Sequence, residues 1–429
     1  MFTTNLLGKC AVAMVGRMAI AILMITTIVP FSASHAQTYS ILHSFTGGLS
    51  GAYPYDGLTM DRAGNLYGTT ESGGSADQGM VFKLSNHNGS WTFTALYSFT
   101  GGNDGARPYA GVTIGPDGAL YGATSVGGLG NPNCPGGGCG TVYKLTPPAR
   151  ICSRVQCPWT ETVLYRFVDS PTGVNYPWGR VIFDAAGSLY GTTVQGGTGG
   201  CGSPGCGAVY KLSPNGGGWV ETTIYSFTGQ GDGATPYDTL AMDGAGNLYG
   251  TTYYASIFSG GYGTVFELSP SGGGWTEHTL YTFQGGTDGG NPEAGVILDS
   301  AGNLYGATTE SNIGVLEGVA FELSPSGGGW TYSVLSALSG SVGQDLSLDS
   351  AGNLYGTGIF GGIHGFGYVF KLTNSGGAWT QTDLHDFNDE GGDGFGPFST
   401  VVFDAAGNLY GTTNGGGSGF AGVVWEISH

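Results

Sequence analysis

The chain consists of short apolar stretches that alternate with polar, glycine-rich turns, and the same order of stretches recurs along it. The most constant element is the tripeptide Leu-Tyr-Gly, which occurs seven times at intervals of 50 to 69 residues. Self-similarity at such a period is typical of an architecture in which every copy forms one supersecondary unit. The copies begin at Leu66, Leu120, Leu189, Leu248, Leu304, Leu354 and Leu409.

Each copy contains four runs of about five residues that suit β-strands, separated by Gly, Pro, Asp and Ser. In the first copy the runs are 57–60, 66–70, 81–84 and 91–99. Four antiparallel strands joined by tight turns form one sheet, and seven such sheets arranged radially form a propeller. We therefore expect an all-β fold: a seven-bladed β-propeller of four-stranded antiparallel blades, as a single domain over residues 37–429.

The two ends of the repeat region complement each other. Residues 39–45 form a run of the fourth type that precedes the first copy, and the seventh copy stops after its third run, at 423–427. We expect the N-terminal strand to complete the last blade and close the ring, which leaves no open sheet edge. A linear solenoid would not need such a match.

A turn with the pattern Asp-x-Ala-Gly-Asn, or a close variant, precedes most Leu-Tyr-Gly copies. Asp favours the first position of a type I turn, and Gly takes the left-handed conformation that follows. Calcium-binding loops are the alternative, but the spacing lacks their alternating carboxylates. We interpret the pattern as a structural hairpin turn. Its Asp stands at 61, 184, 243, 299, 349 and 404, and the second copy has Gly115 in that place.

The N-terminus predicts export. Lys9 and Arg17 precede the apolar stretch 18–29, and small residues follow up to Ala36. This order is typical of a signal peptide, here 1–36, whose apolar stretch is short for a membrane span of about 20 residues. We expect an extracellular, periplasmic or cell-surface protein whose mature chain does not insert into a membrane.

The net charge of the chain limits the kinds of binding partner that we expect. The formal net charge of −18 becomes −20 when Lys9 and Arg17 are removed with the signal. A phosphate-binding surface needs clustered Lys and Arg, so the sequence argues against nucleic acid. The same charge argues against an anionic membrane surface and is compatible with cation binding. We expect a monomer whose partner is a carbohydrate or a surface protein.

Six cysteines of the predicted mature chain form three pairs of identical spacing. Export and an even count favour disulfides, whereas paired cysteines are also the half-sites of zinc centres. The intervening glycines and prolines form turns that bring each pair together. We predict the disulfides Cys134–Cys139, Cys152–Cys157 and Cys201–Cys206, the first and third being the firmer two.

These motifs resemble one known family. The run AGNLYGTT, followed by a Gly-rich loop and by VFELSPSGGGWTEHTLYTF at 265–283, resembles the tandem-repeat proteins of Gloeobacter and Verrucomicrobia over essentially all of 39–429. The resemblance implies an exported propeller and supplies no catalytic motif. More distantly, Asp-x-x-Gly-Asn-Leu-Tyr resembles the NHL and gluconolactonase-like propellers, some of which use a metal held by acidic and Asn side chains. Such a set cannot be placed on this sequence.

Candidate binding residues lie in the linkers that join the fourth strand of one blade to the first strand of the next. With the first strand innermost, we expect these linkers near the mouth of the central channel. Aromatic rings and carboxylates suit a sugar, because its apolar face stacks on rings and its hydroxyls meet acceptors. The alternative is that Asp-Gly forms turns and the aromatic residues pack between blades. The candidates are Asp104, Asp232, Asp288, Asp393, Tyr55, Tyr109, Tyr176, Trp178 and Tyr237.

The sequence holds no Gly-x-Ser-x-Gly element and no phosphate loop that opens a helix. We therefore predict a non-catalytic binding module, and name no catalytic residue and no cofactor. The sequence does not decide whether the channel binds calcium or another divalent ion. An enzyme acting on sugars, lactones or polysaccharide is the first alternative, because carboxylate pairs form only in space. A structural repeat protein of the envelope is the second.

Overall fold

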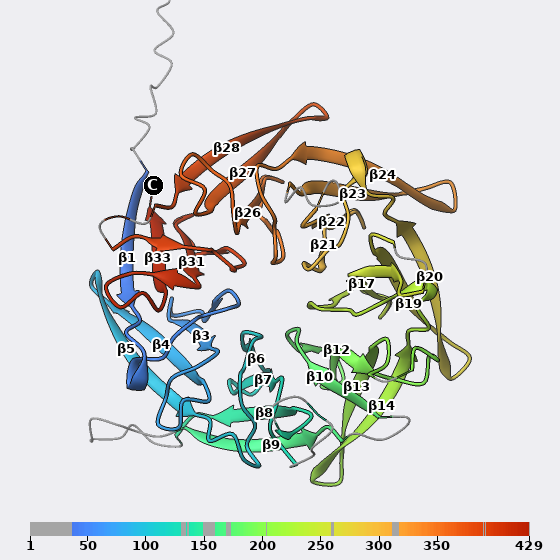
Figure 1. Cartoon of the computed structure of the whole chain (residues 1–429), viewed down its shortest axis with the longest axis horizontal. Coiled ribbons are helices and arrows are strands. Elements are labelled where there is room, and N and C mark those ends of the chain that lie inside the picture. The colour runs from blue at the N-terminus through green and yellow to red at the C-terminus, as the bar shows by residue number, and fades with distance from the viewer. Residues whose placement is uncertain are drawn as a thin grey trace, which may run out of the picture. The chain divides into compact units, whose positions relative to one another are not determined.

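Seven four-stranded antiparallel sheets surround a central axis in the computed structural model, as Figure 1 shows. The structure describes residues 37–429 except 130–133, 135–136, 149–158, 169–172, 203, 259–260, 311–316, 389, 391 and 429. The predicted signal peptide and the Cys152–Cys157 pair lie outside the described residues. The predicted seven-bladed propeller is confirmed.

Each blade repeats the four predicted runs in order from the axis outwards. The innermost strands are β2 (Thr59–Met60), β6 (Thr113–Ile114), β11 (Ile182–Phe183), β16 (Ala241–Met242), β21 (Val296–Leu298), β25 (Ser347–Leu348) and β30 (Val402–Phe403). The second strands carry Leu-Tyr-Gly and are β3 (Leu66–Thr70), β7 (Leu120–Thr124), β12 (Leu189–Gly196), β17 (Leu248–Thr252), β22 (Leu304–Ala307), β26 (Leu354–Gly358) and β31 (Leu409–Thr413).

The third and fourth strands are longer and form the outer half of every blade. The third strands are β4 (Met80–His87), β8 (Thr141–Thr146), β13 (Ala208–Asn215), β19 (Thr264–Ser271), β23 (Val319–Ser326), β27 (Tyr368–Ser375) and β33 (Val423–Ser428). The outermost strands are β5 (Ser90–Ser98), β9 (Thr160–Arg166), β14 (Gly218–Ser226), β20 (Gly274–Thr282), β24 (Gly329–Ala337), β28 (Ala378–Asp386) and, in blade 7, β1 (Thr38–Ser44).

Short additional strands tie the loops of one face together. The strand β10 (Val174–Pro177) extends the sheet of blade 3, where it pairs with β12. Two further pairs join a linker to the loop between the second and third strands, namely β15 (Gln230–Ala234) with β18 (Tyr254–Ser256) and β29 (Gly394–Phe395) with β32 (Gly415–Gly416). The helical turns in the described residues include the 3₁₀ turns Gly48–Ser50 and Gly286–Asp288.

The N-terminal strand closes the ring. Residues of β1 pair antiparallel with β33 from Thr38 opposite Ser428 to Ser44 opposite Val423. The last blade thus takes three strands from the end of the chain and its outermost strand from the beginning. This arrangement confirms the closure that the sequence predicts.

The repeated Asp-x-Ala-Gly-Asn segment is a hydrogen-bonded hairpin turn. In blade 1 the Asp61 carboxylate accepts hydrogen bonds from the Ala63 and Asn65 amides at 2.9 Å, and from the Tyr67 hydroxyl at 3.0 Å. In the second copy this role falls to Asp117 instead, which accepts from the Tyr121 hydroxyl at 3.0 Å. The structural interpretation of the turn is confirmed, because each carboxylate is occupied by its own hairpin.

Neighbouring blades interlock through aromatic side chains. The tryptophan at the start of an outermost strand lies edge-on against the Leu-Tyr-Gly tyrosine of the preceding blade, as in Trp330 with Tyr249 at 6.1 Å between ring centroids. Trp91 makes the same contact with Tyr410 at 5.8 Å, which joins blade 1 to blade 7. These tryptophans therefore pack between blades, and the packing continues across the closed joint.

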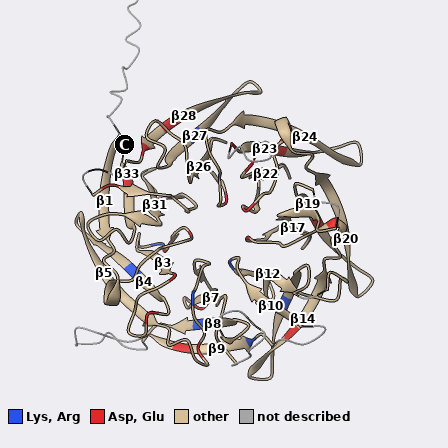
Figure 2. Cartoon of the chain, in the orientation of Figure 1, with Lys and Arg blue, Asp and Glu red and all other residues tan. Residues whose placement is uncertain are grey.

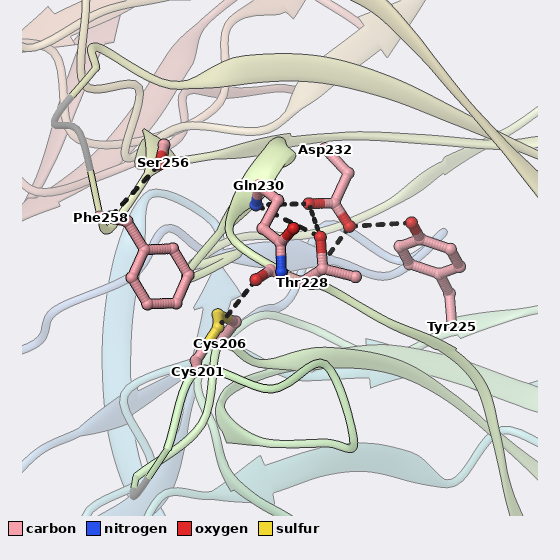
Figure 3. Close-up of a disulfide and its surroundings, with 8 residues drawn as sticks. All are labelled: Cys201, Cys206, Tyr225, Thr228, Gln230, Asp232, Ser256 and Phe258. Carbon is pink, nitrogen blue, oxygen red and sulfur yellow. Dashed lines mark hydrogen bonds between the residues drawn. A yellow bond between two sulfur atoms is a disulfide. The ribbon is translucent and has the colours of Figure 1, made fainter.

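Two of the three predicted disulfides lie in the described residues, and both form: Cys134–Cys139 and Cys201–Cys206. Each closes a loop between the second and third strands of its blade. Figure 3 shows the Cys201–Cys206 bridge beside the next linker, where Cys201 Sγ lies 3.2 Å from the Thr228 carbonyl oxygen. Both disulfides therefore lie on the face that carries the linkers.

Candidate functional site

A cavity of about 210 Å³ lies at the channel mouth on the linker face. Its lining comes from the last linker residues before the innermost strands of five blades, which explains why side chains far apart in sequence meet there. The lining residues are Tyr55, Trp178, Tyr237, Asp238, Glu293, Gly343 and Gln344. The linker face was the face that the sequence predicted for binding.

Aromatic side chains form an arc around this mouth. Tyr109 stacks on Trp178 with ring centroids 4.3 Å apart and an angle of 2° between the planes. Tyr237 continues the arc edge-on to Trp178 at 5.5 Å, and Tyr55 begins it edge-on to Tyr109 at 5.3 Å. Tyr176 also contacts Trp178, at 5.5 Å. The five predicted aromatic residues are thus brought together, while their role in binding stays a prediction.

The arc is open on one side. Blades 5 and 6 place Glu293 and Gly343 where blades 1 to 4 place aromatic rings. Blade 7 restores an aromatic residue with Phe398, which stacks on Tyr55 at 4.7 Å. The mouth therefore has an aromatic wall and, opposite it, a wall with a carboxylate and no ring.

An ion pair lies across the channel below the arc. Arg180 at the start of blade 3 reaches Asp56 of blade 1, with Nε 2.6 Å from Oδ2 and Nη2 3.0 Å from Oδ1. The path is open because Gly111 lies between them: a Cβ there would be 2.8 Å from Arg180 Nη2. The Gly111 amide donates to Asp56 at 2.6 Å. This fork-shaped pair matches the planar guanidinium of Arg180 to both oxygens of the Asp56 carboxylate.

Three more carboxylates face the channel without such a partner. Burial raises the pKa of Asp238 and of Asp345, and the charges of neighbouring aspartates raise both further. Burial also raises the pKa of Glu293 to about 7, with added repulsion from Asp238. Asp238 Oδ1 accepts from the Thr239 amide at 2.7 Å, but its buried Oδ2 has no hydrogen-bond partner. The cavity wall therefore carries more carboxylate than its donors satisfy.

The linkers are fixed by residues in the left-handed region of φ, two positions before the arc. Thr235 has φ of 63°, which is uncommon for a β-branched residue and marks a constrained site. Its amide donates to the Cys206 carbonyl at 2.7 Å, and its own carbonyl accepts from the Tyr253 amide at 3.1 Å. The Tyr176 amide donates in the same way to the Cys139 carbonyl at 3.0 Å. Both disulfide loops thus position aromatic residues of the arc.

The four predicted aspartates lie elsewhere. Asp104 Oδ2 accepts from the Tyr97 hydroxyl on outermost strand β5 at 3.0 Å. Asp232 binds Tyr225 of its own outermost strand in the same way, as Figure 3 shows. Asp288 likewise binds Tyr281, and Asp393 binds His385. Their placement beside the channel was wrong, because each carboxylate is used to fix its linker to the outer strand. A contact between them and a ligand stays a prediction.

The channel carboxylates were missed from the sequence. The signal that finds them is an alignment of the seven copies on the buried residue that starts each innermost strand, from Leu58 to Val401. The position just before it holds Gly, Gly, Arg, Thr, Gly, Asp and Thr, so that Arg180 and Asp345 stand out as exceptions. One position earlier, the same alignment gives Asp56 and Asp238.

Charge and metal-ligand chemistry limit the site further. In Figure 2 lysine and arginine are scattered singly over the described blades. Among the described residues, no group of three or more His, Cys, Asp or Glu side chains is placed to hold a metal ion. That part of the chain also holds no helix with the length and apolar character needed to cross a membrane.

Comparison with known proteins identifies the family. A model of the Gloeobacter/Verrucomicrobia repeat matches residues 26–203 and 135–347, which together span most of the chain. The chain belongs to the family of proteins that carry this repeat, as its motifs indicated. A comparison with curated proteins found no match.

Solved structures share the fold at low identity. PorZ, described as a surface component of the type-IX secretion system of Porphyromonas gingivalis, matches with a TM-score of 0.50 and 13% identity over 90% of this chain. This chain spans 47% of PorZ. A putative 6-phosphogluconolactonase from Bacteroides uniformis matches with a TM-score of 0.48 and 14% identity, over 77% of this chain and 84% of that one. A putative glucose dehydrogenase from Thermus thermophilus gives 0.44 and 15%, over 91% and 100%. At such identity the likeness to PorZ shows the fold alone.

Proposed function

We propose that this propeller is a binding module that takes one carbohydrate unit in the cavity at its channel mouth. The observation that carries the proposal is the aromatic arc, which faces a wall of carboxylate and amide groups across a small cavity. Aromatic faces stack on the apolar face of a sugar, while carboxylate and amide oxygens accept its hydroxyl protons.

The size of the cavity favours a single unit. Pockets for drug-sized ligands span roughly 300 to 1,000 Å³. A cavity of about 210 Å³ is smaller and suits one ring or the end of a longer chain. Trp178 is central to it, because Trp178 lines the cavity and contacts four tyrosines of the arc.

The experiment is a pull-down of the mature chain, 37–429, on cellulose, chitin and chitosan, with the supernatant assayed for released sugar. We expect retention without release. We expect Trp178→Ala to lower the affinity at least about tenfold, which corresponds to about 1.4 kcal/mol of binding free energy. The matched control is Trp379→Ala, which removes a tryptophan that packs between blades against Tyr305. Equal retention of both variants, or none of the unchanged protein, would contradict the proposal.

A second candidate is an enzyme that acts on sugars. One observation favours it: Glu293, with a pKa of about 7, lines the cavity next to Asp238, which suits a general acid. Release of sugar into the supernatant that is lost in Glu293→Gln would support the enzyme over the binding module. Release that persists in Glu293→Gln would exclude this residue as the acid.

We further propose that the protein is exported and acts as a monomer outside the cytoplasm. Support comes from the two disulfides, which persist in oxidising compartments. N-terminal sequencing of protein recovered outside the cytoplasm should begin at Gln37. Recovery of the chain only from the cytoplasm, with reduced cysteines, would contradict export.

A further inference from the structure

We propose that the ligand of the channel-mouth cavity carries an ammonium group, which lies between the aromatic arc and the carboxylates Asp238 and Glu293. This inference rests on the proposed binding function and names the chemistry that the site selects. An amino sugar or a small organic ammonium would both present this group.

The charge balance around the cavity favours a ligand with a positive charge. Arg180 is engaged by Asp56 in a two-point ion pair, and its attraction for Asp238 does not outweigh the effect of burial and of Asp56 on that carboxylate. Asp238 and Glu293 both line the cavity, and no lysine, arginine or histidine is among the lining residues. Burial disfavours the charged form of Glu293, and repulsion from Asp238 disfavours it further. A cation between them would remove that repulsion, whereas a neutral sugar would not.

The Asp238 carboxylate also favours a cationic ligand, because one of its oxygens accepts no hydrogen bond. Asp238 is more than nine-tenths buried, with 9% of its surface exposed, and it lines the cavity. Its Oδ1 is held by the Thr239 amide at 2.7 Å, which fixes the carboxylate, while its buried Oδ2 has no hydrogen-bond partner. A buried carboxylate oxygen without a donor is costly. The protein therefore compensates the charge of this carboxylate poorly, and an ammonium group of a ligand beside Asp238 would compensate it.

The aromatic wall of the cavity favours an organic ammonium group over a metal ion. Trp178, Tyr55 and Tyr237 line the same cavity, and the faces of such rings attract ammonium groups more strongly than they attract neutral groups. A metal ion is less well served, because calcium takes six to eight oxygen ligands. The described residues offer no cluster of three metal-ligating side chains here. Rings and two carboxylates together suit an organic cation.

The test is calorimetric titration of the mature chain with glucosamine, N-acetylglucosamine, glucose and choline at pH 7. We expect glucosamine to bind at least tenfold more tightly than the two neutral sugars. Asp238→Asn should lower the affinity for glucosamine about tenfold and leave that for glucose unchanged. The control Glu390→Gln, which removes a carboxylate from an exposed loop residue, should change neither.

The outcomes separate this inference from the proposed function. Equal affinity for glucosamine and both neutral sugars would overturn the ammonium and keep the carbohydrate. Binding of choline with no binding of any of the three sugars would support the ammonium group and overturn the proposal that the ligand is a carbohydrate. No binding of any of the four overturns both. Glu293→Gln provides a second variant should Asp238→Asn fail to fold, and an unchanged preference for glucosamine in the folded variants would also overturn the inference.

Discussion

Carboxylates in this protein are held in two opposite states, and the number of donors around each decides which. In the hairpin turns burial alone would raise the pKa, but hydrogen bonds from the Asn and Tyr side chains and from backbone amides outweigh it. The pKa is therefore lowered for Asp61, Asp117, Asp184, Asp243, Asp299, Asp349 and Asp404. Around the channel the donors are too few, and the pKa of Asp238, Glu293 and Asp345 is raised.

These states predict that the contribution of Glu293 to the stability of the fold falls as the pH rises from about 4 to 8. The pKa of Glu293 is higher in the folded protein than in the unfolded chain, so its contribution is complete below about 4 and is lost as the pH passes 7. Glu293→Gln keeps the uncharged form. We expect the variant to be more stable than the unchanged protein at pH 8, by about 1 to 3 kcal/mol, and equal to it at pH 4. Thermal unfolding of the ligand-free proteins measures the difference.

The comparison with a variant is needed because other groups titrate in the same range. Burial also raises the pKa of Glu161 on β9 to about 7, and Asp238 and Glu310 are the charges that face Glu293. Glu390→Gln removes an exposed carboxylate and should show the same pH profile as the unchanged protein. If the stability of Glu293→Gln changed with pH in the same way as that of the unchanged protein, Glu293 would not be the group responsible for the predicted difference.

The aromatic half of the mouth could be predicted at this scale, and the charged half could not. Tyr109, Trp178 and Tyr237 each lie four residues before the start of an innermost strand, so a local pattern places them near the axis. Asp56 and Arg180 are 124 residues apart, and no local pattern shows that blades 1 and 3 bring them into contact. Asp104 was misplaced because a turn aspartate and a channel aspartate look alike in sequence.

At the scale of the element, the linkers that enter the innermost strands are anchored on both sides. Four of them begin at an outermost strand with an aspartate that binds a side chain of that strand, as Asp232 binds the Tyr225 hydroxyl at 2.9 Å. Each then meets the loop of the preceding blade through an amide such as that of Thr235. The loops of blades 2 and 3 are closed by a disulfide, so the covalent bond limits the motion of the arc.

Removing the second disulfide should loosen one linker and leave the others as they are. With Cys201→Ser and Cys206→Ser, we expect faster hydrogen–deuterium exchange over residues 228–240, because the Thr235 amide donates to the Cys206 carbonyl. The internal control is the linker 284–295, where the Asn291 amide donates to the Tyr262 carbonyl and no disulfide is involved. Unchanged exchange over 228–240 would show that the disulfide does not position this linker.

The hairpins explain why the elements themselves were predictable. In Asp61 to Tyr67 a single carboxylate binds four donors within seven residues, so the turn depends only on local sequence. A motif of this kind keeps its meaning wherever it recurs. The extra strands β10, β15 and β29 were not predicted, because they pair with loops whose length and sequence differ from blade to blade.

At the scale of the molecule, the joint between β1 and β33 holds the ring closed. A proline in β1 should open it, since proline has no amide donor and its fixed ring disturbs the pairing of a strand. For Ile41→Pro, opposite Trp425, we expect a Tm lower by at least about 5 °C and a larger radius of gyration. Thermal unfolding and small-angle X-ray scattering measure the two effects.

The matched control is Thr94→Pro in outermost strand β5, opposite Lys83. That strand follows β4 in its own blade, so the ring stays closed when its pairing is weakened. We expect a comparable loss of Tm with an unchanged radius of gyration. An unchanged radius for Ile41→Pro as well would show that aromatic contacts such as Trp91 with Tyr410 are enough to hold blade 7 against blade 1.

The joint also governs the order in which the protein is made. The ribosome produces β1 before every other strand of the ring, but its partner β33 is among the last residues produced. The entropy cost of the final pairing is modest, because it grows only with the logarithm of the intervening length. Throughout synthesis, however, β1 is an unpaired edge that another chain can pair with. The pairing that leaves the finished ring without a gap is thus the one most open to error while the chain is incomplete.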